Sequence, residues 1–179
     1  MQKGIMISGT GGQGIVAAGE FLSDALFRTG YDVINSRSYG SEARGGSCRS
    51  EVLVSDDEIY DLSLGEADIL VILSTPAFRR YLGRAKKGAL VLVDSKVMEE
   101  VGDEEFRRDV ELIPVSATEI AIQLGNAIVA NMVLLGALSG KMPHLISLDQ
   151  LKEAIKEGMR PSMQEINFKA IESGHSAVN

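Results

Sequence analysis

The sequence contains very few of the side chains that hold metals, clusters or disulfides. Among its 179 residues there are one cysteine, two histidines and no tryptophan. Because an iron–sulfur cluster needs about four thiolates, Cys48 by itself supports neither a cluster nor an intrachain disulfide. His144 and His175 stand in no metal-ligand spacing. We therefore expect no metal site in this chain, and any cluster chemistry must come from other chains.

Positive charge, aromatic residues and long apolar runs are also scarce. Lys and Arg number 18 against 25 Asp and Glu, which gives a net charge of −7, and aromatic residues make up 5%. Such a chain repels phosphate backbones and offers few stacking surfaces, so we expect no nucleic-acid partner. No apolar run approaches the roughly 20 residues that cross a bilayer, and residues 1–4 lack signal-peptide features. We expect a cytoplasmic protein without membrane contact.

The remaining composition is that of an ordinary globular protein, with 45% hydrophobic and 24% charged residues. These values exclude a disordered or collagen-like chain. A length of 179 residues suits one compact core, so we expect a single domain over residues 1–179.

The first thirty residues have the pattern of a strand, a glycine-rich turn and a helix. Residues 3–8 form a short apolar run that leads into glycines, and residues 15–29 carry polar side chains at every fourth position. Gly30 follows as a typical helix stop. This pattern is the first half of a βαβ unit.

Further strands and helices complete an α/β pattern. Strands are predicted at residues 32–37, 50–54, 69–73, 90–93 and 110–115, and a strand at residues 59–62 would pair back as an antiparallel hairpin. Ser116, Ser147 and Ser162 each open a capping box, and Gly174 is a predicted helix stop. Residues 127–138 are apolar nearly all round, typical of a buried helix or an interface. The sequence predicts a Rossmann-like three-layer sandwich with a mostly parallel sheet and a helical C-terminal end.

The glycine turn is a candidate anion site. Gly9, Gly11 and Gly14 have Gly-x-Gly-x-x-Gly spacing between a strand and a helix, where backbone N–H groups and the helix dipole favour an anionic oxygen. An alternative is that these glycines only let helix and sheet pack closely. The candidate binding residues here are Gly9, Thr10, Gly11, Gly12, Gln13 and Gly14.

The end of the second predicted strand argues against NAD. A dinucleotide enzyme places Asp or Glu about 20 residues after the glycines, whereas residues 34–37 read Ile-Asn-Ser-Arg. Arg37 could instead face a 2′-phosphate, so an NADP-binding module stays open as an alternative.

Residues 38–47 have no helical or strand period and read as an exposed loop. The arginine fork is suited to phosphate or carboxylate, and the glycines let backbone approach a ligand or another subunit. An exposed loop with only local charge contacts is equally compatible with these residues. Cys48 reads as a small buried group, and neither histidine reads as a general base. The candidate binding residues of the loop are Tyr39, Glu42, Arg44, Gly45 and Gly46.

These two glycine segments carry a family resemblance. Residues 9–14, residues 38–46 with their continuation to Val52, and residues 131–136 resemble the gamma subunit of the 2-oxoacid:ferredoxin oxidoreductases, most closely the 2-oxoglutarate type. The similarity covers nearly the whole chain. Ser41 stands where relatives often carry proline, which makes the loop less rigid.

The resemblance implies a subunit of an enzyme that converts a 2-oxoacid and coenzyme A into acyl-coenzyme A. Thiamine diphosphate with Mg, iron–sulfur clusters and ferredoxin carry that chemistry, and alpha, beta and often delta subunits are the implied partners. The glycine turn and loop would serve the coenzyme A side, with no catalytic residue in this chain. A scaffold-only subunit, the identity of the oxoacid (2-oxoglutarate, pyruvate or indolepyruvate) and self-association of the isolated chain stay open.

Overall fold

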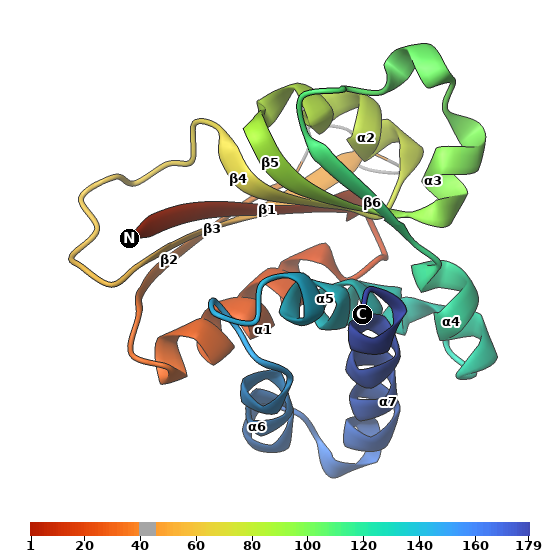
Figure 1. The fold of residues 1–179 in the computed structure, drawn as a ribbon. Helices are drawn as coiled ribbons and strands as arrows, with labels where there is room; N and C mark the ends of the chain where they lie inside the picture. Colours follow the sequence, from red (N-terminus) through yellow and green to blue (C-terminus); the bar gives the residue numbers. More distant parts are fainter. Residues whose placement is uncertain (40–45) are drawn as a thin grey trace.

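The computed structural model describes residues 1–39 and 46–179 (Figure 1). One six-stranded sheet has the order β2-β3-β1-β4-β5-β6. Its strands are β1 (Gln2–Thr10), β2 (Asp32–Tyr39), β3 (Ser47–Ser55), β4 (Ala67–Ile72), β5 (Ala85–Asp94) and β6 (Glu111–Val115). The helices are α1 (Ile15–Arg28), α2 (Thr75–Tyr81), α3 (Ser95–Glu100), α4 (Ala117–Gln123), α5 (Ala130–Lys141), α6 (Leu148–Gly158) and α7 (Pro161–Ala177).

The sheet is mixed because one strand runs against the others. β3 pairs antiparallel with both β1 and β2, whereas β1, β4, β5 and β6 pair parallel in sequence. The predicted mostly parallel sheet is confirmed, but the predicted hairpin strand at residues 59–62 is wrong, and the antiparallel pairing comes from β3 instead. Those residues have no strand structure. β3 already pairs with β2 on one side and with β1 on the other, so it has no free side for a returning strand.

Helices cover both faces of the sheet, as predicted for a three-layer sandwich. α2 and α3 pack on one face, and α1, α4 and α5 pack on the other. α6 and α7 lie outside α1 and α5 and form the helical C-terminal end (Figure 1). Strand residues alternate between the two cores, so Met6 faces α2 while Ile5 and Ile7 face α1.

α5 and α7 approach each other closely through glycines. A Cβ on Gly136 would collide with the Ile171 carbonyl oxygen, and a Cβ on Gly174 would collide with that of Val133. The predicted helix stop at Gly174 is therefore wrong, because α7 continues to Ala177 and this glycine serves packing. The predicted burial of residues 127–138 is confirmed for α5, whose residues from 130 to 139 are all buried.

Only one of the three predicted capping boxes forms. Ser147 and Gln150 cap each other's backbone at the start of α6. At α4 the Thr118 N–H donates to Asp94 instead, and Ser116 Oγ contacts Ser95 Oγ at 3.3 Å. α7 begins at Pro161, so Ser162 already lies inside the helix.

Candidate functional site

The glycine turn joins the end of β1 to the start of α1. Gly12 (φ 88°) and Gly14 (φ 69°) adopt left-handed backbone that strongly favours glycine. Gly11 and Gly12 are exposed, and beyond the adjoining residues no atom of the described chain lies within 4 Å of where their Cβ atoms would be. Gly14 is the N-cap residue of α1 and offers no side chain to its first N–H groups. The first N–H groups of α1 therefore have no side-chain cap, and such groups favour an anion.

Gln13 holds this turn in place rather than facing a ligand. Its Oε1 accepts from the Thr10 N–H at 2.8 Å and from the Thr10 hydroxyl at 3.2 Å, and its Nε2 donates to the Leu73 carbonyl at 3.0 Å. A Cβ on Gly9 would lie 2.5 Å from Gln13 Oε1. Of the six residues predicted in the turn, Gly9, Thr10 and Gln13 thus shape it.

The turn lies at the switch point of the sheet. The chain leaves β1 toward α1 on one face and leaves the neighbouring β4 toward α2 on the other face (Figure 1). Open α/β sheets bind ligands outside the carboxyl ends of the strands at such a point. We refer to this end of the sheet, where β1 and β4 finish, as the carboxyl edge.

An arginine cluster, made of Ser47, Arg49, Arg80 and Tyr81, lies beside the turn. Ser47 pairs with Thr10, so the start of β3 belongs to the carboxyl edge. The guanidinium carbons of Arg49 and Arg80 lie 5.5 and 5.6 Å from the centre of the Tyr81 ring. Arg80 also donates to Ser47 Oγ at 3.2 Å. Buried Ser47 and Tyr81 thus hold two guanidinium groups, of which Arg80 is exposed and Arg49 is half-buried.

The charges of this cluster are only partly neutralised. Glu51 is buried and accepts from Arg49 and Arg84, each at 2.7 Å. Arg79 pairs with Glu105 at 2.8 Å. For Arg80, no carboxylate of the described residues lies within ion-pair distance. Within residues 1–39 and 46–179, Arg80 is therefore a cation without a carboxylate partner, close to the strand pair of Ser47 and Thr10.

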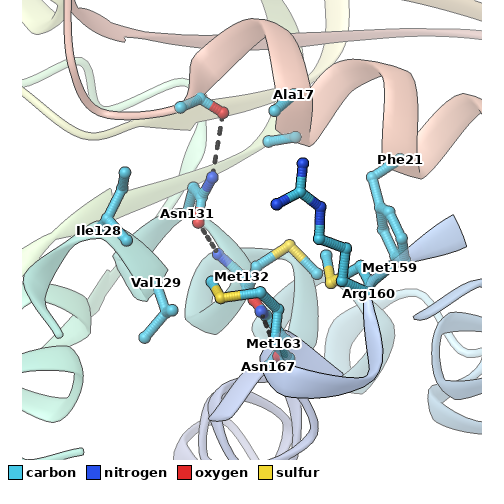
Figure 2. A pocket seen from close by; sticks show the side chains of 12 residues that line it. Ala17, Phe21, Ile128, Val129, Asn131, Met132, Met159, Arg160, Met163 and Asn167 are labelled. Carbon is cyan, nitrogen blue, oxygen red and sulfur yellow. Dashed lines mark hydrogen bonds between the residues drawn. The ribbon is translucent and has the colours of Figure 1, made fainter. Parts of the chain in front are cut away.

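A cavity of about 350 Å³ opens on the other side of the turn, between α1, α5 and the start of α7 (Figure 2). Asn131 Nδ2 donates to the Gly14 carbonyl at 3.0 Å and fixes the inner end of this cavity to the turn. Figure 2 shows the guanidinium of Arg160 directed into the cavity. Most other lining groups are apolar, among them Phe21, Met132, Met159 and Met163.

The structure places the remaining predicted site residues as follows. Tyr39 ends β2, paired with Cys48, and Gly46 directly precedes β3. Glu42, Arg44 and Gly45 lie outside the described residues, so their predicted role stays a prediction. Cys48 is buried, and this burial raises the pKa of its thiol, which favours the inert protonated form.

The two histidines and Arg37, the candidate contact to a 2′-phosphate, do not belong to the carboxyl edge. His144 is exposed, and His175 contacts Ser139 Oγ at 2.9 Å. Arg37 pairs with Glu20 on α1 at 2.6 Å. Because β3 separates β2 from β1, Arg37 lies two strands from the glycine turn, about 10 Å at normal strand spacing. This order removes the second-strand position that a dinucleotide fold uses.

Residues 1–39 and 46–179 contain neither a cluster of metal-ligating side chains nor a membrane-spanning helix. No three His, Cys, Asp or Glu side chains gather there as metal ligands. No helix in these ranges is both long enough and apolar enough to span a bilayer.

Comparison with known proteins identifies the family. The family model "Pyruvate ferredoxin/flavodoxin oxidoreductase" matches residues 4–177. The chain belongs to the pyruvate ferredoxin/flavodoxin oxidoreductase family. It is 37% identical to the 2-oxoglutarate synthase subunit KorC of Methanothermobacter thermautotrophicus, over 99% of this chain and 96% of that one. It is 27% identical to the indolepyruvate oxidoreductase subunit IorB of Archaeoglobus fulgidus, over 98% and 95% of the two chains.

Solved structures of family proteins have the same fold. The gamma subunit of keto/oxoacid ferredoxin oxidoreductase from Geobacter sulfurreducens matches with a TM-score of 0.85 and 28% identity, over 99% of this chain and 97% of that one. The 2-oxoglutarate:ferredoxin oxidoreductase from Magnetococcus marinus, with 2-oxoglutarate, coenzyme A and succinyl-CoA bound, matches with a TM-score of 0.85 and 25% identity, over 99% of this chain and 31% of that one. The predicted resemblance to gamma subunits is confirmed.

Proposed function

We propose that this chain is the gamma subunit of a 2-oxoglutarate:ferredoxin oxidoreductase and that its carboxyl edge binds the phosphate groups of coenzyme A. The identity of 37% to a 2-oxoglutarate synthase subunit favours 2-oxoglutarate over pyruvate or indolepyruvate as the oxoacid. The observation that carries the binding role is the position of the arginine cluster directly beside an open glycine turn.

Each part of the edge suits a different property of a phosphate ester. The uncapped N–H groups of α1 and the exposed backbone of Gly11 and Gly12 supply short-range donors and the positive end of a helix dipole. Arg80 supplies a charged planar fork whose partners among the described residues, the Ser47 hydroxyl and the Tyr81 ring, are both neutral. We propose that Arg44 adds a further charge from the neighbouring loop.

The contribution of this chain would be positional. A single cysteine supplies too few thiolates for an iron–sulfur cluster, so electron transfer and decarboxylation would belong to partner subunits. By holding the phosphates, the carboxyl edge would fix the far end of coenzyme A and raise the effective concentration of its thiol at the reacting centre. No side chain of this subunit would form a bond to substrate.

The test compares three arginine variants of the assembled oxidoreductase by the Kd and KM of coenzyme A. Arg80→Gln should weaken coenzyme A binding by about tenfold or more, because it removes a charged contact to phosphate. Arg79→Gln is the matched control, since Arg79 is the next residue on α2 but already pairs with Glu105. Arg160→Gln tests whether the phosphates lie in the α7 cavity instead.

The outcomes separate the possibilities. Unchanged coenzyme A affinity in Arg80→Gln would remove the arginine cluster from the site, and a loss confined to Arg160→Gln would move the phosphates to the other face of the sheet. Tight binding of NADPH by the isolated chain would favour the NADP-binding alternative. Weaker assembly, with an unchanged KM for coenzyme A in the enzyme that does assemble, would favour a scaffold.

A further inference from the structure

The segment between β3 and β4 is an irregular loop held at both ends. The acidic loop, residues 56–66, extends beyond the sheet at the end where β1 begins, which we refer to as the amino edge (Figure 1). Leu64 is buried against β1 so tightly that a Cβ on Gly4 would collide with it, and Ile59 packs on the α2-side core. Arg84 donates to the carbonyls of Leu64 and Gly65. The loop is therefore a fixed projection of the amino edge.

Between these two anchors the loop presents large apolar side chains to solvent. Tyr60 is 82% exposed and Leu62 is 79% exposed, the two highest values among the large hydrophobic residues of the described chain. The intervening Asp61 is exposed as well. Two such side chains on one short fixed segment would gain free energy by burial, and tyrosine is enriched at the centres of protein interfaces.

The charge of the loop defines the surface that would cover it. Residues 56–66 contain five carboxylates, Asp56, Asp57, Glu58, Asp61 and Glu66, and no Lys or Arg. In the described chain the only cation within ion-pair distance of these carboxylates is the Met1 amino group, which contacts Asp56. A covering surface must therefore supply positive charge around an apolar centre.

We infer that the acidic loop docks on a basic surface of another subunit of the same oxidoreductase, with Tyr60 and Leu62 as the buried centre of that contact. The inference rests on the proposed function only in taking the partner to be a subunit of that enzyme. The loop lies at the opposite end of the sheet from the glycine turn, so a partner bound there leaves the carboxyl edge open. A second copy of this chain fits less well, because two acidic loops would repel each other.

The test measures association of this chain with the remaining subunits of the oxidoreductase, expressed and purified as a complex without it. The double variant Tyr60→Ser/Leu62→Ser should weaken the Kd of association by about tenfold or more. Phe27→Ser is the matched control, since Phe27 is 65% exposed but lies on α1, on the other face of the sheet. Circular dichroism and Tm of each variant check that the chain still folds.

A second pair of measurements tests the charge of the partner. Asp57→Lys/Asp61→Lys should weaken association by about tenfold, and raising NaCl from about 0.05 to about 0.5 M should weaken wild-type association. Unchanged binding by Tyr60→Ser/Leu62→Ser, or stronger binding by Asp57→Lys/Asp61→Lys, would overturn the inference. So would a dimer of the isolated chain that the Tyr60→Ser/Leu62→Ser change abolishes.

The readouts distinguish this inference from the proposed function. If the loop variants associate normally, the effect of Arg80→Gln on coenzyme A affinity is still expected, because the two sites lie at opposite ends of the sheet. Conversely, if Arg80→Gln does not change the affinity for coenzyme A, the association constants of the loop variants still test the acidic loop. Wild-type chain that never associates with the other subunits would overturn both.

Discussion

Two surfaces at opposite ends of the sheet differ in charge and in construction. At the carboxyl edge, backbone donors of the glycine turn stand beside the guanidinium groups of Arg49 and Arg80. At the amino edge, the acidic loop presents five carboxylates around Tyr60 and Leu62. The overall charge of −7 does not show this difference, since the arginine cluster and the acidic loop are counted together in one sum. Net charge therefore describes the solubility of this chain better than it describes either surface.

The two ends also differ in how they are built. The carboxyl edge is open backbone, where Gly11 and Gly12 leave room for a ligand to approach the main chain. The amino edge is a projection whose exposed groups are side chains on a loop anchored by Leu64 and Arg84. The first arrangement suits a small anion and the second suits another protein.

The largest expected effect is a loss of coenzyme A affinity caused by a change at the carboxyl edge alone. Gly11→Asp adds a carboxylate where, beyond the adjoining residues, no described atom lies within 4 Å of the new Cβ. Coenzyme A affinity should fall by about thirtyfold through charge repulsion. The fold should tolerate the change, since an acidic group near a helix N-terminus is favourable. Gly65→Asp, equally open but on the acidic loop at the amino edge, should leave affinity unchanged. Equal losses in both variants would contradict a local effect.

A smaller effect compares two glutamines at opposite ends of β1. Gln13→Leu leaves the Thr10 N–H and the Leu73 carbonyl without their partner, and unfolding free energy should fall by about 1–3 kcal/mol. Gln2→Leu removes only an exposed contact of 3.4 Å with Asp61 and should change stability by less than about 0.5 kcal/mol. Urea unfolding of both variants measures the difference. Similar losses would show that the turn does not depend on Gln13.

The smallest expected effect, on Tm, compares a carboxylate paired with arginine, Asp109, with the carboxylates of the acidic loop. Arg107 binds Asp109 through two contacts of 2.9 and 2.7 Å and holds the pKa of that carboxyl below its ordinary value. A lowered pKa in the folded state means that this stabilisation is present at neutral pH and is lost as pH falls through the folded pKa. Asp109→Asn should therefore lower Tm slightly at pH about 7 and not at pH about 2. Its association with partner subunits should equal wild type, unlike that of Asp57→Lys/Asp61→Lys.

Local pattern was sufficient for most elements and failed where distant segments decide. The alternation of residues 59–62 resembles a strand, yet Ile59 faces the core as an anchor while Tyr60 and Leu62 are exposed. Ser116 has the spacing of a capping box, but Asp94 from the end of β5 caps α4 instead. Gly174 resembles a helix stop because no local feature shows that the Val133 backbone lies against it.

The candidate site was only half visible in the sequence. The glycine turn is a contiguous motif, and its left-handed glycines follow from spacing and context. The arginine cluster joins β3 to α2, and Ser47 and Arg80 lie 33 positions apart. Neither segment alone has a binding signature. The start of β3 reaches the glycine turn only because β3 lies between β1 and β2, and a strand order of this kind depends on contacts between distant segments.

The glycine contacts between α5 and α7 constrain how related chains can vary in length. A single inserted residue turns the rest of a helix by about 100°, which would replace Gly136 or Gly174 at the crossing by a bulkier neighbour. Asn131 and Arg160 stand at the starts of these two helices, on opposite sides of one cavity. Insertions and deletions among descendants of this gene should therefore collect in the surface connections and spare both helices.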